Sequence, residues 1–286
     1  MYSCGVPEES QLGFDDGLPL PDVGSWAETK YRLVGLYDAL FSTGMKHKWG
    51  RRIYIDLYAG AGYNRIRTSG KVLLGSPILA LKVADPFDKY IFCEEDPELL
   101  SALQQRAKRE APDANAVFIA GDCNVKVEDI CREIPIATTG NTVLSLCFVD
   151  PYNLGIKFAT LRKLSARFMD FLCLLALYMD ANRNYSQYVS EDSPRVSEFL
   201  GTENWRDAWF KAQSQSIPFP RFLAQQFAQQ MGTLDYIQPP FYSMKEVRSD
   251  EKNLPLYHLA LFSRHERAYE FWDGVLKYST DHLGLF

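Results

Sequence analysis

Apolar residues follow one another almost without interruption in five short segments of the chain. The segments are IYIDLYA (53–59), KYIFCEE (89–95), AVFIAGD (116–122), TVLSLCFVD (142–150) and FLCLLAL (171–177). Strands that are covered on both faces show this pattern, whereas half-exposed strands alternate apolar with polar residues. The pattern therefore predicts five buried strands.

Helical periodicity fills the intervals between these segments. Ser25 with Glu28 predicts a capping box at the start of a helix over 26–42. Ser76 and Asp96, each followed by proline, are predicted N-caps of the next two helices. The helices expected between the strands cover 77–84, 97–110, 125–133 and 158–166. Alternation over more than 120 residues predicts an α/β fold with a doubly wound, mostly parallel sheet.

The alternation ends after residue 177. Three helical patterns within 178–235 predict a helical insertion or cap, and two strand-like segments within 239–264 predict a hairpin followed by a helix over 265–279. The predicted organisation is an extended arm (1–24), a Rossmann-like core (25–177), a cap (178–235), and a closing hairpin and final helix (236–286).

The first strand ends in the glycine turn DLYAGAG (56–62). Glycine at such a turn allows tight turning and close approach of a ligand to the backbone. A dinucleotide fingerprint needs a third glycine three residues on, but position 65 is arginine. A nicotinamide oxidoreductase is therefore disfavoured.

Acidic residues stand at the ends of the next three strands. Glu94 or Glu95 could accept both hydroxyls of a ribose, Asp122 could accept an adenine amine, and Asp150 begins an Asp-Pro-Tyr sequence. Open α/β sheets bind ligands at the carboxyl ends of their strands. Each acid by itself has an alternative role as a helix N-cap or turn residue.

This order of motifs resembles that of S-adenosylmethionine methyltransferases. DLYAGAG resembles the turn of DNA cytosine methyltransferases, but Asp150-Pro151-Tyr152 stands where those enzymes need Pro-Cys, and the chain has no Pro-Cys dipeptide. Asp-Pro-Tyr resembles the Asp-Pro-Pro-Tyr motif of amino-methyltransferases, in which the acid orients the acceptor amine and the ring stacks on a flipped base. The alternative is that Asp150-Pro151 only ends the strand and lines the cofactor pocket.

From residue 18 to 280 the chain resembles the three-Cys-motif partner proteins. The residues that carry this resemblance are Trp26, Lys30, YIDLYAGAG, GSPILAL (75–81), KYIFCEEDP, GDCN, FVDPYNLG (148–155) and FLGTENW (199–205). The resemblance implies a class I methyltransferase fold and a partner protein with a three-cysteine motif, typical of radical S-adenosylmethionine enzymes. The Cys-Glu-Glu-Asp run departs from the family's single-Asp ending, so the choice between Glu94 and Glu95 stays open.

We therefore expect an S-adenosylmethionine-dependent methyltransferase whose acceptor is an amine or other nucleophile on nucleic acid or on a partner-bound substrate. The alternative is a non-catalytic, S-adenosylmethionine-binding partner subunit, with Trp205, Trp209 and Phe210 as exposed docking residues. The predicted catalytic residues are Asp150, Pro151 and Tyr152. The predicted cofactor-binding residues are Asp56, Tyr58, Ala59, Gly60, Gly62, Glu94, Glu95, Asp122 and Cys123.

Charge and cysteine content limit which kinds of protein this chain can be. The 286 residues carry a net charge of −5, which argues against a protein that simply coats nucleic acid, although KHKWGRR (46–52) is a local basic stretch. The six cysteines contain no Cys-x-x-Cys pair, so we expect reduced thiols, no metal site and a cytoplasmic location. Cys93, Cys147 and Cys173 lie in apolar runs and are expected in the core. No signal peptide or membrane span is expected.

Overall fold

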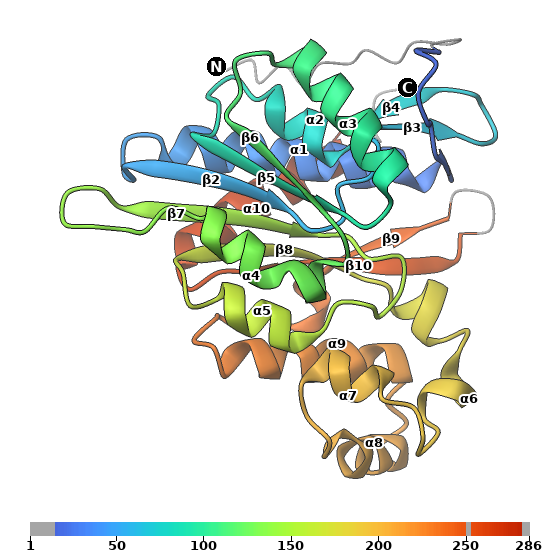
Figure 1. Cartoon of the computed structure of the whole chain (residues 1–286). Coiled ribbons are helices and arrows are strands. Elements are labelled where there is room, and N and C mark those ends of the chain that lie inside the picture. The colour runs from blue at the N-terminus through green and yellow to red at the C-terminus, as the bar shows by residue number, and fades with distance from the viewer. Residues whose placement is uncertain (1–14, 250–252, 282–286) are drawn as a thin grey trace. The chain divides into compact units, whose positions relative to one another are not determined.

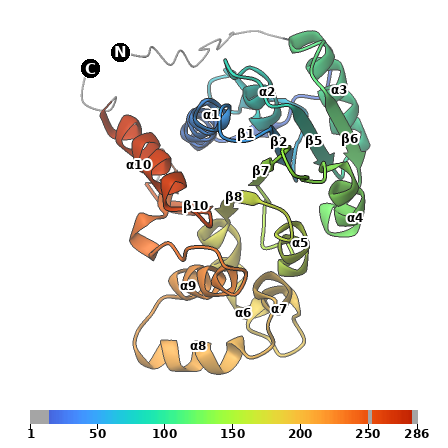
Figure 2. The same cartoon turned by 90° about the vertical axis from the view of Figure 1, so that its left-hand side faces the viewer.

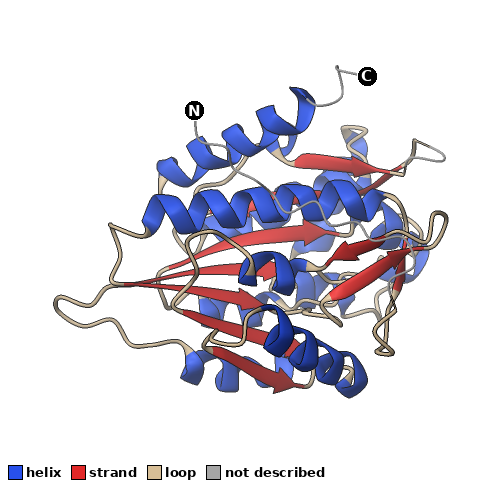
Figure 3. Ribbon diagram, turned by 90° about the horizontal axis from the view of Figure 1, so that it is seen from above, coloured by secondary structure: helices blue, strands red, loops and turns tan. Residues whose placement is uncertain are grey.

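The computed structural model describes residues 15–249 and 253–281. It divides into two compact units, one formed by residues up to Phe148 and from Arg267 onward, the other by Val149–Glu266. Each unit is described by itself. Both contain strands and helices, as the red and blue elements of Figure 3 show.

The first unit contains four parallel strands, in the order β6-β5-β2-β7. Their bounds are Arg51–Asp56 (β2), Lys89–Glu94 (β5), Ala116–Ala120 (β6) and Val143–Val149 (β7). All seven residues of β7 are buried, as are the last four of β2, which explains the uninterrupted apolar runs in the sequence. Because the strands are parallel, their carboxyl ends lie at one edge of the sheet (Figure 1).

Helices cover both faces of these strands. Helices α1 (Trp26–Met45), α2 (Ser76–Leu81) and α3 (Pro97–Glu110) lie on one side, and α4 (Cys123–Glu133) lies on the other (Figure 2). Helix α10 (Glu266–Asp281) packs its Trp272 edge-on against Tyr37 of α1, with ring centroids 5.7 Å apart. The core beneath α1 is aromatic. The ring centroid of Tyr54 lies 5.4 Å from that of Phe87 and 6.4 Å from that of Tyr90.

A second, three-stranded sheet follows the glycine turn. It joins β1 (Asp22–Val23), β3 (Tyr63–Ile66) and β4 (Val72–Leu74) in the order β1-β3-β4. No strand was predicted for residues 63–74, because the alternation there is too short to predict a hairpin. Residues 22–23 of the predicted arm pair with β3, and residues 1–14 of the arm lie outside the described part of the chain.

The second unit contains the antiparallel strands β8 (Met169–Leu175), β10 (Pro255–Phe262) and β9 (Lys245–Arg248), in the order β8-β10-β9. Helix α5 (Phe158–Leu164) precedes β8, and a π-helical turn (Leu177–Ala181) follows it. A helical insertion and a short 3-10 turn (Phe241–Ser243) come next. The insertion comprises α6 (Tyr185–Tyr188), α7 (Arg195–Leu200), α8 (Trp205–Ser214) and α9 (Phe219–Gly232).

The predicted fold class is confirmed. The larger sheet of the described chain has seven strands and is mostly parallel, with a C-terminal antiparallel hairpin and a helical insertion. Numbered along the chain within that sheet, the strands follow the order 3-2-1-4 in the first unit and 5-7-6 in the second, as in the class I methyltransferase fold. The turn of the hairpin at 250–252 lies outside the described residues, and the predicted domain boundaries stay predictions.

Three local predictions are wrong. Ser25 makes no side-chain capping bond, because its own backbone is helical and Glu28 pairs instead with Lys71 on the β3–β4 hairpin. The N-cap of α2 is Gly75 rather than Ser76, since helical geometry begins one residue earlier than expected. Trp205 and Trp209 are buried rather than exposed, because both pack against Phe219 inside the insertion.

Other predictions hold. Asp96 caps α3 by accepting hydrogen bonds from the amides of Glu98 (2.8 Å) and Leu99 (3.2 Å). Cys93, Cys147 and Cys173 are buried core residues. Within the described ranges, no helix combines the length and apolar character needed to cross a bilayer; the cytoplasmic location stays a prediction.

Candidate donor site at the ends of the parallel strands

The glycine turn after β2 places two residues in the left-handed region. Gly60 has φ +61° and Gly62 has φ +83°, values that glycine adopts without steric cost. A Cβ added to Gly62 would come within 3.0 Å of Leu103, whereas one added to Gly60 would meet no atom within 4 Å. Gly62 is therefore needed for packing, and Gly60 has open space beside it where a ligand can approach the backbone.

Glu94, at the end of the neighbouring strand β5, holds this turn. Its carboxylate accepts hydrogen bonds from the amide of Gly60 at 2.7 Å and from that of Asp96 at 3.0 Å. Glu94 is half-buried, while the next residue, Glu95, is exposed. The sequence left open whether Glu94 or Glu95 is the acid beside the glycine turn, and these contacts favour Glu94.

Beside Glu94 lies an open hollow of about 660 Å³ at the junction of β5 and α3, lined by Glu94, Glu95, Asp96, Pro97 and Glu98. Four of these five residues are acidic. Carboxylates accept hydrogen bonds from hydroxyl groups and attract cations, so this lining suits groups of those kinds.

A buried acid pair lies beneath the turn. Asp56 ends β2, is fully buried, and accepts a hydrogen bond from the amide of Tyr58 at 3.2 Å. Asp38 of α1 is also fully buried, and its pKa is raised well above the ordinary value by burial and by the nearby charge of Asp56. Asp38 was not among the residues predicted from the sequence. The available signal was its place four residues after Val34, on the buried face of α1.

Tyr58, Cys93, Asp122 and Cys123 are brought together from three different strand ends. The hydroxyl of Tyr58 interacts with the thiol of Cys123, and burial raises the pKa of the tyrosine far above its usual range. Burial also raises the pKa of Cys123 to about 12, so the thiol is neutral. It can line the site, but it lacks the thiolate form that a nucleophile needs. Ala59 joins the group through its amide, which donates to the carbonyl of Cys93 at 2.9 Å.

Asp122 has the capping role that was its alternative interpretation. Its Oδ1 accepts hydrogen bonds from the amide (2.8 Å) and the side-chain Nδ2 (2.9 Å) of Asn124 at the start of α4. No described residue donates to Oδ2 of Asp122. The carboxylate can therefore cap the helix and still accept a hydrogen bond from a ligand.

The Asp150-Pro151-Tyr152 loop follows β7 and belongs to the second unit. Pro151 is buried, and the Tyr152 side chain is 73% exposed. The loop is anchored within this unit by Asp180 of the π-helical turn, which accepts hydrogen bonds from the amide of Leu154 (2.8 Å) and from Tyr188 (2.9 Å). Asp180 was not among the residues predicted from the sequence, although it is an acidic residue soon after the apolar run of β8.

Comparison with solved structures gives the fold and little more. Protein LPL1258 from Legionella pneumophila aligns over 90% of this chain and 93% of its own, with 12% identity and a TM-score of 0.51. At that identity the similarity shows a shared fold only. No family model and no curated protein matches the chain.

Two further solved structures were determined with S-adenosylmethionine, and both align with TM-scores below 0.5. Trm1 from Pyrococcus horikoshii aligns over 91% of this chain and 62% of its own, with 7% identity and a TM-score of 0.44. TYW2 from M. jannaschii aligns over 80% and 77%, with 12% identity and a TM-score of 0.37.

Proposed function

We propose that this chain is a methyltransferase that uses S-adenosylmethionine. The observation that carries the proposal is the contact between the Gly60 amide and the Glu94 carboxylate, beside open space at Gly60. It couples a tight glycine turn to a strand-end acid at the edge of a parallel sheet, where a nucleoside can lie across both.

The residues present fit this donor. Glu94 retains acceptor capacity for ribose hydroxyls beyond its two backbone contacts, because an ionised carboxylate offers about four lone-pair sites. Oδ2 of Asp122 suits the adenine amine, and Tyr58, Ala59 and Gly60 suit the methionine part. The bound donor would supply an electrophilic methyl group on a sulfonium. The contribution of the protein is to hold the acceptor close to that methyl and in line with it.

The acceptor role falls to the Asp150 loop. In this proposal the Asp150 carboxylate orients an acceptor amine, and the exposed ring of Tyr152 stacks on a base or packs against a partner-bound substrate. Pro151 stiffens the loop between them. Nucleic acid is thus one candidate acceptor, and a substrate presented by another protein is the second.

A three-cysteine-motif protein remains the proposed partner. Of the three aromatic residues first expected to dock it, only Phe210 on α8 is exposed, with 76% of its side chain accessible. The neighbouring Trp205 and Trp209 hold α8 in place by donating hydrogen bonds to Ser197 (3.0 Å) and Tyr185 (3.3 Å). A non-catalytic binding subunit would use the same surface without turnover.

Glu94→Ala is expected to weaken S-adenosylmethionine binding by about 1–3 kcal/mol, because it removes a charged hydrogen-bond acceptor and leaves the Gly60 amide without its partner. Glu95→Ala is the matched control and should have a much smaller effect, since that side chain is exposed and alternation directs it away from Glu94. Calorimetric titration compares the two. A larger loss for Glu95→Ala would contradict the assignment of Glu94.

A transfer assay tests the reaction. The protein is incubated with methyl-labelled S-adenosylmethionine and either cellular nucleic acid or a cell extract, and label in the macromolecular fraction is counted. We expect incorporation that depends on the protein. Donor binding without incorporation into either acceptor would support the binding-subunit alternative.

A further inference from the structure

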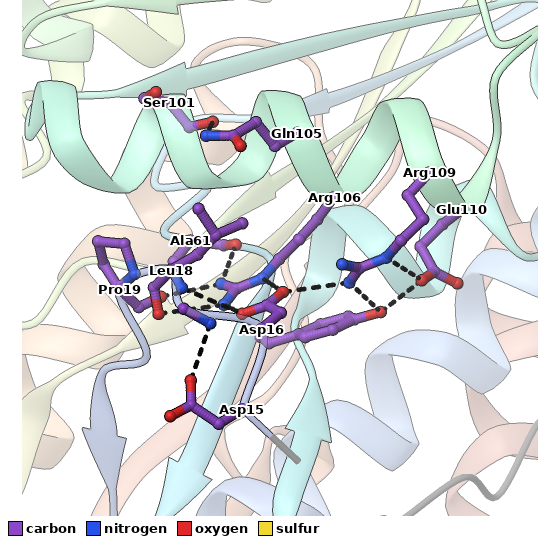
Figure 4. A network of polar contacts seen from close by, with 12 residues as sticks. Asp15, Asp16, Leu18, Pro19, Ala61, Ser101, Gln105, Arg106, Arg109 and Glu110 are labelled. Atoms are coloured by element: carbon purple, nitrogen blue, oxygen red, sulfur yellow. Dashed lines mark hydrogen bonds and ion pairs between the residues drawn. The ribbon is translucent and has the colours of Figure 1, made fainter.

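Arg106 of α3 is a fully buried cation next to the glycine turn. Its Nη1 donates hydrogen bonds to the carbonyl of Ala61 at 2.8 Å and to that of Pro19 at 2.9 Å. Its Nε and Nη2 donate to the two carboxylate oxygens of Asp16, at 2.9 and 2.7 Å. Figure 4 shows the guanidinium between the segment 15–19 and the turn. One side chain therefore connects the two segments.

Asp16 supplies the charge that this cation needs. The Asp16 side chain is only 8% exposed, and hydrogen bonding to Arg106 holds its pKa at about 2, well below the usual range. Removing one member of a buried ion pair leaves an uncompensated buried charge, which is far less favourable than losing an exposed pair. The position of Arg106 therefore depends on Asp16.

The carbonyl that Arg106 binds belongs to the residue between the two left-handed glycines. The turn is held at its amide side, where Gly60 donates to Glu94, and at its carbonyl side, where Ala61 accepts from Arg106. Gly62 is fixed next, because its carbonyl accepts from the amide of Gly75 at 2.7 Å. Loss of the Arg106 contact would free the peptide that sets the shape of the turn.

We propose that Asp16 and Arg106 are positioning residues that hold the glycine turn in its donor-binding shape, so that docking of the segment 15–19 is coupled to donor affinity. The affinity part of this inference rests on the proposed function. The structural part does not, because it concerns the turn in the donor-free protein. In this proposal the segment 15–19 affects donor binding indirectly, through Arg106 and the glycine turn, and not by contacting the donor itself.

The test uses two variants. Asp16→Asn keeps the shape of the side chain and removes its negative charge, and Arg106→Lys keeps the positive charge and removes the guanidinium group that donates to several acceptors at once. Asp22→Asn is the matched control, since it removes a carboxylate from the adjoining strand β1 and breaks an exposed ion pair, the Asp22–Arg65 contact at 2.8 Å, without touching Arg106. Donor affinity is measured by calorimetry, and amide exchange at Ala59, Gly60 and Gly75 is measured by NMR without donor.

We expect Asp16→Asn and Arg106→Lys to weaken S-adenosylmethionine binding about tenfold or more and to speed exchange at these three amides, while Asp22→Asn changes affinity less than twofold. Equal effects of Asp16→Asn and Asp22→Asn on affinity would overturn the inference. If the wild-type protein binds no donor, the proposed function fails. In that case the amide exchange rates test the structural part of the inference. Faster exchange at the three amides in Asp16→Asn supports the coupling between the segment 15–19 and the turn, and unchanged exchange overturns it.

Discussion

Gly60→Val is expected to reduce S-adenosylmethionine binding by ~100-fold or more while the protein stays folded. A side chain at φ +61° costs about 1–2 kcal/mol in backbone strain. A further 1–3 kcal/mol is expected if the turn shifts and the hydrogen bond from Gly60 to Glu94 is lost. The new methyl groups would also occupy the open space where the donor is proposed to lie.

The matched control for this substitution is Gly70→Val. Gly70 has φ +72°, and a Cβ there would also meet no atom within 4 Å, so the strain is similar, but the residue lies in the turn between β3 and β4. Both variants should lose some thermal stability, and only Gly60→Val should lose donor binding. Unchanged affinity in a folded Gly60→Val protein would remove the donor assignment.

Asp150→Ala is expected to reduce turnover by ~100-fold or more, the order seen when a preorganised polar contact to a reacting group is removed. Donor affinity should stay within about threefold of the wild type, because in the proposal this carboxylate faces the acceptor. The measurement pairs a methyl-transfer rate with a calorimetric titration of the donor. If Asp150→Ala instead destroys donor binding, the residue belongs to the cofactor site and the base-amine assignment has no remaining support.

Tyr152 provides the companion pair of variants. Tyr152→Ala should weaken acceptor binding by about 1–3 kcal/mol if the ring stacks on a base. Tyr152→Phe should be nearly silent, because stacking needs the ring and not the hydroxyl. A large effect of Tyr152→Phe would mean that the hydroxyl, rather than the ring, is what the acceptor contacts.

The sequence was informative where one local pattern determines the structure. Uninterrupted apolar runs located β2, β5, β6 and β7, and Asp96-Pro97 located the start of α3 to the residue. Glycine at positions 60 and 62 predicted a tight turn, and both residues have a positive φ, which glycine adopts without steric cost. In each case the cause lies within a few neighbouring residues.

It was uninformative where the cause lies in distant residues. Ser25 followed by Glu28 has the pattern of a capping box, but Lys71, 43 residues after Glu28, pairs with that glutamate. Arg106 lies three residues after Leu103, so the helical period places it on the buried face of α3. A buried arginine needs an acidic or carbonyl partner, and the sequence therefore indicated that a partner exists. Nothing near it identified Asp16, which is 90 positions away. Trp205 and Trp209 were misplaced because their packing partner, Phe219, lies in a later helix.

Titration of the purified, donor-free protein with S-adenosylmethionine tests the central claim most directly. The account predicts saturable binding with one site per chain and competition by S-adenosylhomocysteine. It predicts no competition by a nicotinamide dinucleotide, because Arg65 stands where a dinucleotide site needs its third glycine. Absence of binding to a folded sample, or displacement by the dinucleotide alone, would contradict it.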